Sequence, residues 1–119
     1  MQVETRLSDQ LARYLDLAVS ETKLTAANMA NVDTPGYQTQ GFDFEAEMRR
    51  ALAGLDAGKA ATAPHVRNVD GLVARPDGNN VSMDREGLRL AEAQLKFRTG
   101  VALMRLENQR VMDAIHADK

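Results

Sequence analysis

The stretch AANMANVDTPGYQTQGFDF, residues 26 to 44, joins the end of a predicted helix to a tight turn and an aromatic pair. Pro35 has a fixed φ that suits the second position of a β-turn, and Gly36 accepts the positive φ that a type II turn requires at its third position. Because a proline disfavours the α conformation in the residue before it, the preceding helix should end by residue 32 or 33. Asn31 suits the left-handed position that often closes a helix. Taken alone, the Pro-Gly pair fits a simple helix stop and turn equally well.

Composition restricts the class of protein. A chain of 119 residues fits one domain, and 44% apolar residues with only 4% aromatic residues and no Trp indicate a small or elongated core rather than a deep pocket. The net charge is −2 and both signs are interspersed, so no segment offers the basic field that nucleic acid would need. The absence of Cys excludes disulfides and thiol chemistry. No stretch resembles a cleaved signal or a membrane span, so export would need another route.

A long helix is predicted over residues 7–30, within an N-terminal segment of residues 1–32. Its apolar and small residues recur three or four positions apart, which is typical of one buried helix face. This face is narrow and only weakly hydrophobic, and it consists of Leu11, Leu15, Ala18, Thr22, Ala26 and Met29.

A second long helix is predicted over residues 84–119. Short polar side chains from Ser82 to Asp84 can cap its first turn. Alternating spacings of four and three then continue for about four heptads, which is the pattern of a coiled-coil seam. We take six apolar residues of this seam as the assembly surface: Leu90, Phe97, Val101, Met104, Val111 and Ile115. A neighbouring row suggests contact with more than one partner helix: Leu88, Ala91, Leu95, Ala102, Leu106 and Met112.

Three residues of the second helix leave alternatives open. Gly100 indicates either close approach of another backbone or simple sequence drift, since glycine costs about 1 kcal/mol relative to alanine inside a helix. Gln94 and Asn108 lie on the seam. They either fix its register by hydrogen bonds or face solvent at a gap in the packing.

The segment between the helices, residues 33–83, is rich in turn residues. A short amphipathic helix is predicted over residues 43–54, and residues 57–64 have the composition of a linker. Residues 66–74 could form a small hairpin around Asp70 and Gly71. The fold class expected is therefore mainly α, with the terminal helices paired as an antiparallel coiled coil around a turn-rich, partly disordered middle.

Two blocks of the chain resemble the flagellar rod and hook axial proteins. The first block matches that family's pattern at the end of the first helix, and the second, residues 79–86, resembles the block of its proximal rod subunits. Residues Leu95-Lys96-Phe97 follow that second block. The matching positions of the first block are Asn28, Asn31, Thr34, Pro35, Gly36 and Tyr37.

The resemblance implies a structural subunit of the basal-body rod, the shaft that crosses the periplasm. It implies as partners other rod subunits, the inner-membrane ring with its rod-base adaptor, further copies of the chain, and the flagellar type III export apparatus. Phe44 and Met48 resemble the short element by which that apparatus recognises early substrates, although they fit an ordinary helix face as well.

No catalytic, cofactor or metal constellation is visible, and neither nucleic acid nor a small-molecule substrate is expected. His65 and His116 lie far apart without ligand spacing, and no serine has a base nearby. Enzymatic activity is therefore not expected. Two alternatives remain: a cytoplasmic helical adaptor or export chaperone that uses the same seam, and a different proximal rod subunit of the same family.

Overall fold

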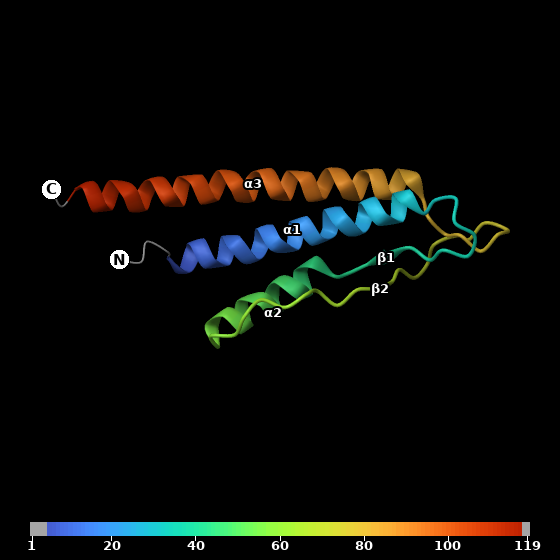
Figure 1. The fold of residues 1–119 in the computed structure, drawn as a ribbon, viewed down its shortest axis with the longest axis horizontal. Helices are drawn as coiled ribbons and strands as arrows, with labels where there is room; N and C mark the ends of the chain where they lie inside the picture. The colour runs from blue at the N-terminus through green and yellow to red at the C-terminus, as the bar shows by residue number, and fades with distance from the viewer. Residues whose placement is uncertain (1–4, 118–119) are drawn as a thin grey trace.

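The computed structural model describes residues 5–117. Its elements are α1 (Arg6–Ala30), β1 (Gln40–Gly41), α2 (Phe44–Asp56), β2 (Arg67–Asn68) and α3 (Met83–His116), as Figure 1 shows. The molecule measures 69 × 27 × 18 Å with a radius of gyration of 18.2 Å. A compact domain of this length would have a radius near 13–14 Å. The expected mainly α fold with two long terminal helices is confirmed in an elongated form.

The two terminal helices pack side by side in opposite directions, so the first turn of α1 and the last turn of α3 lie at the same end of the molecule (Figure 1). At that end Thr5, the N-cap of α1, donates a hydrogen bond of 2.8 Å to Glu107 Oε1. At the other end Asn28 reaches Glu86. Ser82 caps α3 by accepting from the amide of Arg85, as the polar residues before this helix predict.

The face of α3 that packs against α1 is offset from the predicted seam by about one position in the sequence. Its buried positions repeat every seven residues: Glu86, Ala93, Gly100 and Glu107. The predicted seam forms the margin of this contact, where Leu90, Val101, Met104, Val111 and Ile115 are half-buried and Phe97 is 42% exposed.

Small and hydrogen-bonded residues let α3 approach α1 closely. A Cβ at position 100 would lie 2.6 Å from Leu15 Cδ2 and 3.2 Å from Tyr14 Cδ1, so Gly100 marks close approach rather than drift. Gln94 and Asn108 are exposed, which excludes a register role for them within the α1–α3 pair.

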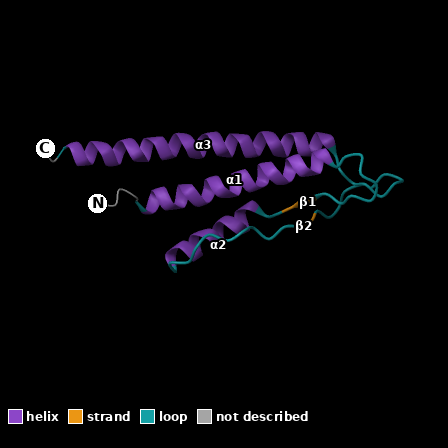
Figure 2. Cartoon of the chain, in the orientation of Figure 1, coloured by secondary structure: helices purple, strands orange, loops and turns teal. Residues whose placement is uncertain are grey.

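The middle segment forms an arm beside α1 that carries α2 and a two-stranded sheet (Figure 2). Asp43 caps α2 by accepting from the amide of Ala46, close to the predicted start of this helix. A small antiparallel sheet is present, but its strands are not the two halves of residues 66–74. Gln40 pairs with Asn68 and Gly41 with Arg67, so β2 pairs with a strand that precedes α2.

The apolar core is thin. Among residues 5–117 the buried hydrophobic residues are Leu11, Leu17, Ala18, Val81 and Ala93. Buried polar and charged residues are more numerous, and among the described residues no fully buried side-chain nitrogen or oxygen atom lacks a hydrogen-bond partner. The fold therefore depends on satisfied polar contacts to an unusual degree, because each of them would be costly if it lost its partner.

Candidate functional site: the helix junction and the outer helix faces

Asn28 is the centre of the junction between the two helices and the arm. Its side chain is 1% exposed and uses every hydrogen-bonding position that an amide has. Nδ2 donates to the carbonyl of Gln40 (2.8 Å) and to Glu86 Oε2 (3.1 Å). Oδ1 accepts from the hydroxyl of Tyr37 (3.0 Å) and from the amide of Gln40 (3.1 Å). One side chain thus joins α1, the turn, β1 and α3.

The carboxylate of Glu86 is 1% exposed at the start of α3. Arg85 Nη1 lies 2.6 Å from its Oε1, and Asn28 Nδ2 donates a hydrogen bond to its Oε2. The pKa of Tyr37 is raised because the phenol is desolvated and because the negative charge of Glu86 lies nearby. The junction therefore holds a neutral phenol and a paired carboxylate, and both orient Asn28.

The second family block closes onto the first. The Asn79 side chain is fully buried, and its Nδ2 donates to the carbonyls of Asn31 (2.9 Å) and Thr34 (2.8 Å). Asn80 Oδ1 accepts from the amide of Thr39 at 2.6 Å. These asparagines serve as the hydrogen-bond partners of a loop that lacks its own regular structure.

The Thr34–Tyr37 turn has the predicted form. Gly36 has φ +76°, and the amide of Tyr37 donates to the carbonyl of Thr34 at 3.2 Å. The prediction for Asn31 was wrong in one respect, because this residue has φ −101° rather than a left-handed conformation. It closes α1 instead through its side chain, which donates to the carbonyl of Ala27 at 2.8 Å. Pro35 is exposed.

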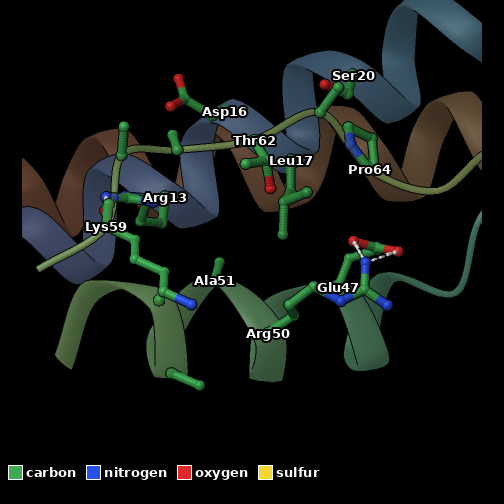
Figure 3. A pocket seen from close by; sticks show the side chains of 15 residues that line it. Arg13, Asp16, Leu17, Ser20, Glu47, Arg50, Ala51, Lys59, Thr62 and Pro64 are labelled. Atoms are coloured by element: carbon green, nitrogen blue, oxygen red, sulfur yellow. Dashed lines mark hydrogen bonds and ion pairs between the residues drawn. The ribbon is translucent and has the colours of Figure 1, made fainter. Parts of the chain in front are cut away.

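An open groove of about 490 Å³ lies between α1, α2 and residues 59–64 (Figure 3). Of its charged side chains, Glu47 and Arg50 form an ion pair, and Arg13 donates to the backbone carbonyl of Lys59 at 2.9 Å. Glu47, which is 7% exposed, is 2.8 Å from Arg50 and also accepts from the amide of His65 at 3.0 Å. Burial by itself would raise the pKa of Glu47, but the His65 amide and the Arg50 charge outweigh it and lower that pKa. These contacts hold α2 against the segment that follows it, at His65.

The two residues predicted for export recognition both lie on α2 and are both half-buried. The Phe44 ring packs edge-on against Tyr14, with centroids 5.5 Å apart, and Lys96 Nζ lies 3.9 Å above it. Met48 is half-buried. Phe44 therefore takes part in packing between α1, α2 and α3 in the folded chain.

The outer face of α3 carries large apolar side chains that nothing in residues 5–117 covers. Leu88, Leu95 and Leu106 are 62%, 66% and 68% exposed. They belong to the neighbouring row predicted to meet another helix. The packing on α1 leaves this row to solvent, so the isolated subunit has an unpartnered helix face.

Sequence reasoning did not identify the buried acids Glu86, Glu107 and Glu47 as contact residues. Glu107 is 3% exposed between Thr5 and Arg110. The signal that could have found it is the seven-residue spacing from Gly100, read without regard to charge. Within residues 5–117, no helix has the length and apolarity to cross a membrane, and no three metal-binding side chains cluster.

An elongated antiparallel helix pair, closed at one end by an asparagine junction and carrying exposed leucines on the outer face of α3, has the form of a structural subunit. No family model matches the chain. Several curated proteins are nevertheless similar to it in sequence. The chain is 31% identical over 127 aligned positions to the flagellar basal body rod protein FlgB of Cereibacter sphaeroides, covering 96% of this chain and 99% of the relative.

The same protein of Salmonella typhimurium is 29% identical over 119 positions, covering 85% of this chain and 86% of the relative. That of Escherichia coli K12 is 27% identical over 121 positions, covering 87% and 88%. The chain belongs to the FlgB family of flagellar basal body rod proteins. It is thus a structural component of the basal body rod and not an enzyme.

Proposed function

We propose that the chain polymerises through the outer faces of α1 and α3, with further copies and other rod subunits as its neighbours. The observation that carries this proposal is the exposed row of Leu88, Leu95 and Leu106 on a helix whose opposite face is already packed. Apolar side chains in such a continuous row are stabilised when another helix covers them. We infer that the inner-membrane ring with its rod-base adaptor receives the first subunits.

The test is a paired substitution on this outer face, Leu95→Asp with Leu106→Asp. Both residues are exposed, so the subunit should keep its helix content. Incorporation into basal bodies and swimming should be lost, because two carboxylates would be buried in the contact. Val73→Asp is the matched control, since Val73 is 90% exposed in a part of the middle segment that is not helical. Normal swimming of the double variant would overturn the proposal.

Substitutions in the predicted seam would test assembly less selectively, because they would also affect folding. Val101 and Met104 are half-buried at the margin of the α1–α3 contact. Val101→Asp with Met104→Asp should therefore unfold the helix pair as well as prevent assembly. Circular dichroism of the purified variants distinguishes the two sites, since the outer-face variant keeps its helices and the seam variant loses them.

We further propose that the junction of Asn28, Asn31, Thr34 and the Pro35-Gly36-Tyr37 turn holds the helix ends together and sets the direction of the arm. The four hydrogen bonds of Asn28 support this role. Disruption of the junction should leave the helices intact but misplace the arm in the assembled rod.

Recognition by the type III export apparatus is proposed for Phe44 and Met48. Because Phe44 is packed against Tyr14 in the fold, the apparatus would bind this element in an unfolded chain. Phe44→Ala should reduce secretion, whereas Phe42→Ala, which alters the stacked neighbour, should not. Loss of stability alone does not hinder export of an unfolded chain, so equal secretion of both variants would count against the role.

A further inference from the structure

We propose that α1 of one copy packs antiparallel on the outer face of α3 of the next copy, in a register that places Val19 opposite Leu95. This inference rests on the proposed function as a polymerising subunit, and it specifies which two surfaces meet and how. The contact joins two different faces, so each copy presents one face to each neighbour and the chain of copies stays open.

The first surface is the third face of α1. One face of this helix packs on α3 and another on α2. The remaining face is exposed and consists of small and charged residues. Their spacing of four and three is that of a coiled-coil seam, and they are Ala12, Asp16, Val19, Lys23, Ala26 and Ala30.

The second surface is the outer face of α3. Leu95 follows the buried Ala93 by two residues, which places it about 200° around the helix, away from α1. The exposed residues on this side also alternate in spacing between four and three, and they are Asp84, Leu88, Ala91, Leu95, Arg98, Ala102 and Arg105. Large leucines on this face complement the small residues on the other, so the helices can approach closely.

An antiparallel register brings every one of these positions to a matching layer. With Val19 opposite Leu95, the small residue Ala26 faces Leu88, and Ala12 faces Ala102. The spacings of the two helices, read in opposite directions, then stay in step over the full length of the contact. An antiparallel pair of heptad seams has this layered arrangement.

Charge supports the same register. It places Asp16 opposite Arg98, and Asp9 opposite Arg105. None of these four side chains forms an ion pair within residues 5–117, so all are available to a neighbour. A shift by one heptad in one direction would set Lys23 against Arg98. A shift in the other direction would keep opposite charges together, with Asp9 at Arg98, but it would place Arg105 beyond the start of α1 at Arg6 and so shorten the contact. A parallel arrangement in step would set Asp16 on Leu88, or on Leu95 after a shift by one heptad, and either would bury an unpaired charge against an apolar side chain.

The absence of cysteine makes disulfide crosslinking a direct test. Val19→Cys combined with Leu95→Cys should give a ladder of disulfide-linked oligomers on a non-reducing gel, in concentrated protein and in isolated basal bodies. The two cysteines face apart within one copy, so any crosslink must join two copies. Val19→Cys with Ala102→Cys is the matched control, since its second cysteine lies one heptad, about 10 Å, out of register and beyond disulfide reach.

A second test uses charge reversal. Asp16→Arg or Arg98→Asp alone should lower the ladder yield at least several-fold, and the two together should restore it. Asp16→Arg with Arg105→Asp should not restore it, because these positions lie in different layers. Stronger crosslinking with Asp16→Arg alone would overturn the antiparallel register.

The outcomes separate this inference from the proposed function. A chain found in basal bodies without a Val19–Leu95 ladder would overturn the register and leave the rod role intact. Absence of the wild-type chain from basal bodies would overturn the proposed function itself. Dimers only, or a crosslink solely to a different protein, would each contradict the open chain of copies.

Discussion

The side-chain amide of Asn28 donates a hydrogen bond of 3.1 Å to the buried carboxylate of Glu86, across 58 residues of sequence. This bond joins the last turn of α1 to the first turn of α3. It also connects the two sequence blocks that resemble the axial family, since Asn28 belongs to one and Glu86 to the other. The two blocks are therefore parts of one structure at the closed end of the helix pair.

Asn28→Asp should destabilise the fold by about 3 kcal/mol, because a second carboxylate would face Glu86 and two donors would be lost. The free energy of unfolding in urea at pH 7 is the measurement. Asn31→Asp is the matched control. Its side chain is partly exposed and bonds to the nearby carbonyl of Ala27, so a cost below about 1 kcal/mol is expected. Equal costs would contradict a special role for Asn28.

Gly100→Ala should destabilise the chain by about 1 kcal/mol or more. Alanine is the better helix former, but its Cβ would lie 2.6 Å from Leu15 Cδ2 and would push the helices apart. Gly87→Ala in the same helix should instead stabilise by about 0.5–1 kcal/mol, since it is exposed and its Cβ would meet nothing within 4 Å. Thermal unfolding of the two variants should therefore shift in opposite directions, and a common shift would refute the close approach.

Acid should weaken the fold through its buried carboxylates. The pKa of Glu107 is lowered by its hydrogen bonds from Arg110 and Thr5, and the net effect of its surroundings also lowers the pKa of Glu47. A carboxyl group with a lowered folded pKa adds stability above its unfolded pKa, near 4.5, and loses it as pH falls through the folded pKa. We expect the urea midpoint to fall as pH drops from about 4.5 toward 3.

A substitution isolates the contribution of Glu47. Glu47→Gln should lower the free energy of unfolding at pH 7, and the difference from the wild type should shrink in acid, where the wild-type side chain is also neutral. Glu45→Gln is the control. Its contact with Arg49 is 3.6 Å long and largely exposed, so it should change stability by less than about 0.5 kcal/mol at either pH. A Glu47→Gln difference that is constant with pH would contradict the electrostatic explanation.

Pro35→Ala probes the proposed junction. Pro35 is exposed and its turn lies outside both helices, so circular dichroism should show unchanged helix content. The freer turn should reduce swimming in soft agar, because the arm would leave the junction in a wider range of directions. Asp33→Ala, also exposed in this loop, serves as the control. Wild-type swimming of the Pro35 variant would argue against the junction role.

Several elements could be predicted from the sequence because their causes are local. The Pro35-Gly36 pair specified the turn, Ser82 specified the start of α3, and heptad spacing specified two long helices with an apolar margin. The pairing partner of β2 could not be predicted. Two-residue strands have almost no pattern of their own, and their pairing depends on where α2 places the chain.

By itself, the sequence determined the length and type of the helices, the turn between them and the family, since each depends on residues near in sequence or on a linear motif. Only the tertiary structure decided which residues face inward. It buried Glu86 and Glu107 because Asn28, Thr5 and Arg110 supply their hydrogen bonds, and it left Leu95 exposed. Whether a charged residue can be buried depends on partners that are distant in the chain, and those partners are known only after folding.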